Sequence, residues 1–161
     1  MLLESRIAWC LETNLIGIRR KMSFAVDETP LLWRGFMPRR REIGNRLSED
    51  LYSLQVYGAD FDFAPHTVFE KWALAPVPDF SSVPEGMETF VIPAGKYVVF
   101  NYCGKAGDSG IFTSIFTEWL PRSGYALDDR PHFEILGELY SNHASDSEEE
   151  IWIPISQGIL K

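Results

Sequence analysis

One acidic side chain stands out in residues 129–136 (DRPHFEIL), which otherwise have the apolar character of a β-strand. Strand alternation places Phe133 and Ile135 on one face, and it places Glu134 on the other face beside His132. That second face is too mixed to be plain hydrophobic core. The sequence therefore leaves two interpretations of Glu134: its carboxylate points into water, or it points into a site.

Aromatic side chains could form the walls of such a site, since they make up 14% of the 161 residues. Trp33 and Trp119 lie on predicted helix faces, where a core role is favoured. For the aromatics on predicted strands, a core role and a pocket role are about equally favoured. Glu70 is a second carboxylate of interest, because alternation places it on the face of Trp72, although exposure to solvent is its default. Together with Glu134, the candidate ligand-binding residues are Trp72, Tyr97, Trp119, Tyr140 and Trp152.

Familiar motifs for other chemistry are missing from the sequence. It contains no G-x-S-x-G, C-x-x-C or H-E-x-x-H motif and no phosphate-binding glycine loop. His66, His132 and His143 have no spacing that indicates a ligand set, so neither a metal nor a cofactor is expected.

Charge and hydropathy exclude several classes of partner. A formal net charge of −8 repels phosphate backbones, so we expect no direct contact with nucleic acid and an attraction for cations. There is neither a signal-peptide core nor a run of about 18 uncharged apolar residues, so no membrane span is expected. Cys10 and Cys103 form no paired motif, which together with these absences indicates a cytoplasmic protein.

An internal repeat indicates how the chain is organised. FMPR at 36–39 is echoed by WLPR at 119–122, and at the same offset QVYG at 55–58 is echoed by ELYS at 138–141. Each half then reads as strand, helix, strand, strand. The predicted elements of the first half are a strand 15–24, a helix from Thr29 to about Pro38, and strands 51–57 and 68–74.

The second half follows the same order. A strand is predicted over 89–102, with a bend or bulge at PAG, 93–95, and further strands over 132–140 and 150–155. Between them lies a helix with an apolar stripe, capped by Asp108 or Ser109 and ended by Pro121 and Gly124.

The two halves need a common core, because three strands and one helix are too small to close an interior alone. We therefore predict an α+β fold: a single domain, 1–161, built of two β-α-β-β repeats, about 14–76 and 87–156. Its antiparallel sheet system would carry two helices on one side and a groove, bordered by Glu134, on the other.

Four blocks of sequence resemble the GyrI-like small-molecule-binding domain, the effector-binding domain of AraC-type and multidrug-responsive regulators. They cover about residues 15–155 in the family's order, and the most diagnostic part is W-L-P-x-S-G-Y followed by R-P-x-x-E. The blocks are LLWRGFMPRRREI, GMETFVIPAGKYVVF, IFTEWLPRSGYALDDRPHFEIL and EEIWIPI.

The resemblance implies a duplicated β-α-β-β fold with a ligand cleft between its halves. It also implies that Glu134, the Glu of P-x-x-E, is the acidic anchor for lipophilic cations. Because only about a dozen residues precede the first block, too few for a helix-turn-helix, we expect a free-standing domain without a DNA-binding head.

Three functions follow as hypotheses, in order of preference. The first is a module that binds amphipathic or lipophilic, cationic small molecules, with Glu134 as counter-charge. The second is a hydrolase of strained, cyclopropane-type electrophiles, with Glu134 as general base. The third is a protein-interaction role like gyrase inhibition, in which the acidic loop 145–150 contacts a basic surface, although such a run is more often simply solvated.

Overall fold

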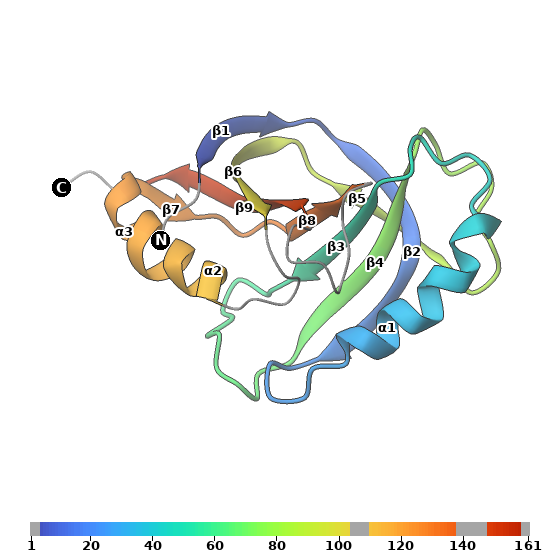
Figure 1. The fold of residues 1–161 in the computed structure, drawn as a ribbon, viewed down its shortest axis with the longest axis horizontal. Helices are drawn as coiled ribbons and strands as arrows, with labels where there is room; N and C mark the ends of the chain where they lie inside the picture. Colours follow the sequence, from blue (N-terminus) through green and yellow to red (C-terminus); the bar gives the residue numbers. More distant parts are fainter. Residues whose placement is uncertain (1–3, 104–109, 138–147, 159–161) are drawn as a thin grey trace.

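A computed structural model describes residues 4–103, 110–137 and 148–158 (Figure 1). The described strands form an antiparallel sheet in the order β1-β6-β9-β8-β3-β4-β2-β5, with β7 paired to β9. The strands are β1 Ser5–Cys10, β2 Thr13–Met22, β3 Leu51–Val56, β4 Phe69–Val77, β5 Glu88–Ile92, β6 Gly95–Cys103, β7 Tyr125–Leu127, β8 His132–Leu136 and β9 Glu148–Gln157. The helical segments are α1 Thr29–Phe36, the 3-10 segment η1 Met37–Glu42, α2 Gly110–Ser114, the π-helical segment η2 Ile115–Trp119, and α3 Leu120–Ser123.

This architecture is the mixed α and β fold, with a large antiparallel sheet and two main helical regions, that the sequence predicts. Each half supplies a strand, a helix and two strands: β2-α1-β3-β4, then β6-α2-β8-β9. The halves meet where β3 pairs with β8, with Ser53 opposite Glu134. β5 joins the first half through β2, while β1 joins the second through β6. The division into two repeats remains a prediction.

The predicted strand 89–102 is instead two strands, β5 and β6. They separate at Pro93 and Ala94, and each then pairs with a different part of the sheet. Proline has no N–H to donate to a strand ladder, so the PAG segment turns the chain. The sequence did not predict β1 or β7, which have only weak strand patterns.

Both helical regions pack on the same face of the sheet, over opposite ends of it (Figure 1). On α1, Leu32 and Phe36 are buried against β2 and β4. The buried side chains of Ile111 and Ile115 belong to a cluster with residues of β6 and β9. The middle strands β3 and β8 therefore lie between the two helix-covered areas, and any opening on this face falls over them.

The opposite face of the sheet is filled by its own side chains. Tyr97 is fully buried there, and Phe133 stacks on Trp152 with 5.3 Å between ring centroids. The predicted placement of Glu134, in a groove on the face away from the helices, is therefore wrong. Glu134 lies on the helix-bearing face, because the large aromatics of β8 and β9 alternate to the other side and close it.

The sequence predicts that Pro121 and Gly124 end the second helical region, and the helix in fact continues through Pro121 and ends at Gly124. The chain passes through the π-helical segment, where the N–H of Leu120 bonds to the oxygen of Ile115, and then makes a final turn that contains Pro121. The wider turn precedes a residue that cannot donate a helix hydrogen bond. Gly124, with φ of 80°, then ends the helix in the left-handed region. The predicted caps Asp108 and Ser109 lie outside the described residues.

No helix among the described residues is long and apolar enough to cross a membrane.

Candidate functional site

A cavity of about 680 Å³ opens on the helix-bearing face, over the middle of the sheet. Elements of both halves line it: the end of β2 and the start of α1, the strands β3, β4 and β8, and the helix α2 with η2. The lining residues are Ser23, Phe24, Asp27, Thr29, Gln55, Tyr57, Phe63, Phe69, Lys71, Phe112, Thr113, Phe116, Thr117 and Glu134.

The walls of the cavity are mainly aromatic. The ring of Phe69 lies 5.0 Å from that of Phe24 and 5.2 Å from that of Tyr57, measured between centroids. On the other side, Phe63 lies 5.8 Å from Phe116. These rings come from both halves of the chain, so the wall exists only when the halves are assembled.

Phe63 has an unusual backbone. It lies in the loop between β3 and β4 with φ of 56°, a conformation that is costly for a bulky residue. Its ring contacts Tyr57 at 5.1 Å and Phe61 at 4.8 Å. Packing of these rings holds the strained residue in place, and Phe63 thereby becomes part of the cavity wall.

Glu134 brings a carboxylate into this aromatic surrounding. Its side chain is half-buried, and the strand register places it opposite Ser53 of β3 and Ile151 of β9. Gln55 and Lys71 also line the cavity and supply polar groups near the middle of the sheet. Glu134 thus lines a cavity on the helix-bearing face of the sheet.

A second carboxyl group, which the sequence analysis passed over, lies beside Glu134. Glu149 is the second residue of β9, and its half-buried side chain is within hydrogen-bonding reach of Glu134. Burial raises the pKa of Glu149 well above its ordinary value, the neighbouring Glu134 raises it further, and Lys71 opposes this. The protonated form of Glu149 is therefore favoured, and in that form it can donate a hydrogen bond to the Glu134 carboxylate.

Two further titratable groups are kept neutral around Glu134. Burial raises the pKa of Tyr57, and the nearby carboxylate of Glu134 adds to this effect. Burial lowers the pKa of His132 to about 4. The ring of His132 meets that of Tyr57 edge-on at 4.9 Å. Neither group carries charge near neutral pH, so the charged lining consists of carboxylates and Lys71.

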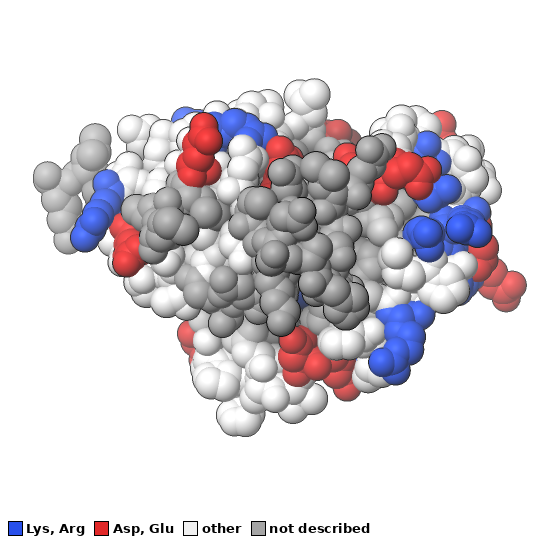
Figure 2. Space-filling view, viewed as in Figure 1, with Lys and Arg blue, Asp and Glu red and all other residues white. Residues whose placement is uncertain are grey.

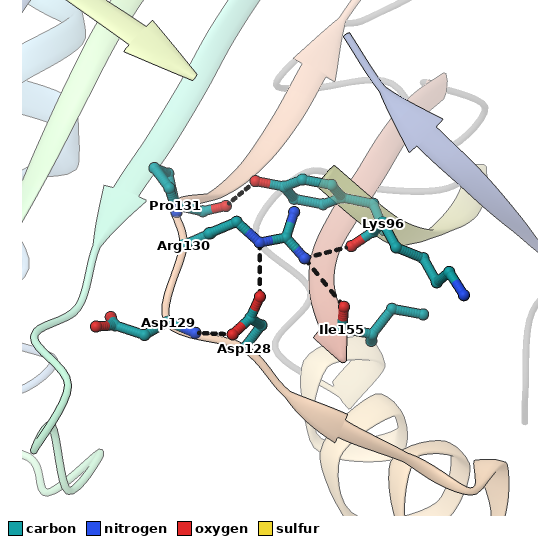
Figure 3. Close-up of polar contacts among 7 residues, drawn as sticks. Lys96, Asp128, Asp129, Arg130, Pro131 and Ile155 are labelled. Carbon is teal, nitrogen blue, oxygen red and sulfur yellow. Dashed lines mark hydrogen bonds and ion pairs between the residues drawn. The ribbon is translucent and has the colours of Figure 1, made fainter. Parts of the chain in front are cut away.

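The R-P-x-x-E motif has a structural explanation around Arg130 (Figure 3). The Arg130 guanidinium donates to Asp128 at 2.8 Å and to the carbonyl oxygens of Lys96 and Ile155 at 2.6 and 3.0 Å. It also lies 4.8 Å from the centre of the Tyr97 ring, whose hydroxyl donates to the Pro131 carbonyl oxygen at 2.8 Å. These contacts tie the start of β8 to β6 and β9, and thereby fix the strand that carries Glu134.

The other sequence-predicted site residues lie elsewhere. Trp72 and Tyr97 are buried in the core cluster on the opposite face of the sheet. Trp152 packs against that cluster and borders a void of only about 20 Å³, which Glu134 also borders. Trp119 packs on Phe100, with ring centroids 5.4 Å apart. Tyr140 lies outside the described residues, as do residues 145–147 of the acidic loop.

Glu70 does not share the cavity with Glu134. It lies on the other side of β4, where it accepts hydrogen bonds from Arg19 at 2.8 Å and from the indole of Trp72 at 2.6 Å. Alternation along β4 correctly put Glu70 with Trp72, and both belong to the face away from the cavity.

The aromatic wall itself came from residues that the sequence analysis did not single out. Phe24 follows β2, and Phe63 lies in the loop between β3 and β4 beside Phe61, a neighbour that does not itself line the cavity. Several large aromatics in a loop are an unusual feature, and this was the signal that could have identified them. Phe112 and Phe116 were recognised only as part of the apolar stripe of a helix.

Comparison with known proteins places this arrangement in a family. Residues 11–155 match the model of the Cass2 family, described as integron-associated effector binding protein. The chain belongs to this family. Its fold and its GyrI-like sequence blocks are thus those of the effector-binding domains that are found in bacterial regulators.

Two curated relatives share part of their length with this effector-binding domain. The transcriptional regulator BrlR of Pseudomonas aeruginosa is 28% identical over 148 residues, which cover 88% of this chain and 52% of that protein. A DNA gyrase inhibitor of Erwinia billingiae is 36% identical over 88 residues, which cover 50% of this chain and 54% of that protein. The matches thus span about half the length of each relative.

A solved structure has the same fold. The structure of SAV2435 bound to tetraphenylphosphonium superposes with a TM-score of 0.66 at 15% identity, covering 96% of this chain and 94% of that one. At this identity the likeness establishes the fold alone.

Proposed function

We propose that this effector-binding domain binds lipophilic cations in its central cavity, with Glu134 as the counter-charge. The observation that carries the proposal is a half-buried carboxylate on the lining of a cavity of about 680 Å³ whose walls are mainly aromatic. The volume lies within the range of roughly 300–1,000 Å³ that is usual for small-molecule sites.

The physical chemistry of this surrounding favours large, delocalised cations. A carboxylate among aromatic rings loses part of its hydration, and an arriving cation restores the lost stabilisation. A compact, strongly hydrated cation would lose its own water shell on entry, whereas a delocalised one has little hydration to lose. The ring faces of Phe24, Phe69 and Phe116 add an attraction for positive charge.

A cationic ligand is also supported by fold-level analogy. SAV2435, which shares the fold, is bound to tetraphenylphosphonium, a lipophilic cation of this kind. The overall charge of −8 adds a long-range attraction for cations.

Calorimetric titration with tetraphenylphosphonium tests the proposal. We expect saturable binding that weakens tenfold or more in Glu134→Gln, equivalent to about 1.4 kcal/mol. Glu70→Gln is the matched control, because it neutralises a carboxylate on the opposite face of β4. Equal binding by all three proteins, each shown to be folded by thermal unfolding, would contradict the role of Glu134.

A hydrolase is the second candidate, and one observation favours it. The pairing of Glu134 with the neutral acid Glu149 sets an ionised carboxylate beside a protonated one, which is the arrangement that general acid and base chemistry needs. Glu134, on the cavity lining, would deprotonate the attacking water, and the leaving carbon or oxygen would receive its proton from the Glu149–Glu134 pair through Glu134. Incubation with a cyclopropane-bearing electrophile should then give a product heavier by one water. A rate no higher than in buffer would rule out this activity for that substrate class.

A protein-interaction role has weaker support. One relative is a DNA gyrase inhibitor, and it matches half of this chain. Of the acidic segment that would make such a contact, 145–150, residues 145–147 lie outside the described residues and residues 148–150 belong to β9. If a variant with neutral residues in that segment still captured the same partner proteins as the unaltered protein, the result would contradict the interaction.

A further inference from the structure

We infer that Glu149 is a second acidic residue of the ligand site, and that a cation binding beside Glu134 takes the place of a proton on Glu149. The inference rests on the proposed function and assigns to that site an exchange of one proton for one cation. Its consequence is that ligand affinity depends on pH in the range where Glu149 gives up its proton.

The geometry follows from the pairing of β8 with β9. Glu134 is opposite Ile151, and Glu149 is opposite Leu136, so the two acidic residues are diagonal neighbours on one face of the sheet. Diagonal neighbours in an antiparallel pair lie within reach of long side chains. Two neighbouring carboxylates in a half-buried site repel each other when both are ionised, which favours a proton on one of them.

The surroundings keep that proton on Glu149. Glu149 is half-buried and does not line the cavity, whereas Glu134 does, so Glu134 is the carboxylate that a ligand would meet. Burial and the negative charge of Glu134 both favour the protonated form of Glu149, and Lys71 on β4 is the positive group that opposes it.

The other groups that face Glu149 do not change this balance among the described residues. Tyr102 is its register partner on β6. The described part of α2 contains no titratable side chain. On β9, Glu150 points to the other face and pairs with Arg6 at 2.9 Å. Glu134 and Lys71 are thus the charged neighbours that set its protonation.

A cation bound at Glu134 would reverse the preference of Glu149 for its protonated form. It cancels the negative charge that held the proton on Glu149, and it places a positive charge one carboxyl group away. The Glu149 O–H bond then breaks, its proton leaves to solvent, and its electron pair stays on the carboxylate. The complex contains one more positive ligand and one fewer proton, so the net charge of the site is unchanged by binding.

Titration with tetraphenylphosphonium at several pH values tests the exchange. In the unaltered protein we expect affinity to rise about tenfold from about pH 6.5 to about pH 8.5, the change expected when binding lowers a raised pKa by one to two units. Calorimetry in two buffers with different ionisation enthalpies should show between about 0.3 and 1 proton released per cation in this range.

Glu149→Gln is the decisive variant, since glutamine can still donate a hydrogen bond to Glu134 but cannot ionise. We expect its affinity to be independent of pH over the same range, close to that of the unaltered protein at the acid end and about tenfold weaker at the alkaline end. An uncharged ligand, triphenylphosphine oxide, serves as the control and should release no proton.

The outcomes separate this inference from the function on which it rests. Saturable cation binding with no pH dependence and no proton release would overturn the exchange and leave the cation site intact. Absence of saturable cation binding at every pH would overturn both. An equal pH dependence in Glu149→Gln would also overturn the exchange, because another group would then carry the proton.

Discussion

At the scale of single residues, the cavity lining contains few charged side chains, and ligand binding depends on each of them. Glu134, Asp27 and Lys71 are the charged residues that line it, and Glu149 lies behind Glu134. In a partly buried site, each charge counts for more than it would on the surface. The selectivity of the domain is therefore expected to follow changes at these positions more closely than changes elsewhere.

Removal of the Lys71 charge tests this expectation. Lys71 is a built-in cation that competes with a positively charged ligand for the same carboxylates, so Lys71→Met should strengthen tetraphenylphosphonium binding. We expect a gain of about three- to tenfold, near 1 kcal/mol, at low ionic strength. Lys21→Met, an exposed lysine on β2, is the matched control and should leave affinity unchanged. Weaker binding in Lys71→Met would mean that Lys71 contributes to the ligand contact.

A second prediction concerns Trp72, which the sequence analysis considered a cavity wall. Trp72→Phe removes the indole N–H that donates to Glu70 at 2.6 Å in the core cluster of the opposite face. It should lower the free energy of unfolding by about 2 kcal/mol, because the hydrogen bond has a charged acceptor. Cation affinity should be unchanged. Denaturant unfolding and calorimetry check the two parts, and a loss of affinity without a loss of stability would contradict the placement.

At the scale of elements, the predicted alternation was right, and the predicted position of the groove, on the face away from the helices, was wrong. The pattern of residues 132–136 correctly separated Phe133 from Glu134, because side-chain direction in a strand depends only on position. Which face the helices cover depends on how β2, β5 and β6 curl around the core, and that follows from pairings between residues far apart in sequence. Glu149 stands in a run of acidic residues that the sequence indicates to be a solvated loop, although it is the second residue of the strand β9.

Close packing between β2 and β4 provides a test at this scale. A Cβ added to Gly17 would lie 1.9 Å from the backbone oxygen of Ala73, so Gly17→Ala would force two paired strands apart. We expect a loss of about 3 kcal/mol in the free energy of unfolding. Gly35→Ala is the matched control: its Cβ would meet only the Ile18 side chain, at 3.6 Å, and a helical alanine should stabilise slightly. Equal stability of the two variants would contradict the predicted β2–β4 packing.

At the scale of the whole molecule, two features matter for ligand binding: the distribution of charged side chains and the assembly of the two halves. On the face shown in Figure 2, Lys and Arg side chains gather at the end that carries α1, and Asp and Glu side chains are spread more widely. The cavity forms where the two halves meet, and its aromatic wall takes residues from both. Ligand binding should therefore stabilise the folded protein as a unit, since the separated halves would contain no complete site.

The pH dependence of folding is a further property of the whole molecule. His132 is 6% exposed, and burial lowers its pKa to about 4. The folded state thus keeps it neutral, while the unfolded state takes up a proton near the ordinary value of about 6.5. Its contribution to stability is fully present above about pH 6.5 and is lost as the pH falls towards 4.

His132→Phe, which keeps an aromatic ring between Tyr57 and Phe116, should weaken this acid sensitivity. Between pH 7 and about 4.5, we expect the unaltered protein to lose about 2 kcal/mol more stability than the variant. Denaturant unfolding at the two pH values measures the difference. If both proteins lose the same stability, the buried histidine is not the source.

The central claim concerns where a lipophilic cation lies, and a crystal structure of the complex with tetraphenylphosphonium tests it most directly. We predict the phosphonium within about 6 Å of the rings of Phe24, Phe69 or Phe116, with the Glu134 carboxylate as its nearest negative group. Density for the cation on the outer surface, or in the cavity but away from Glu134, would contradict the account.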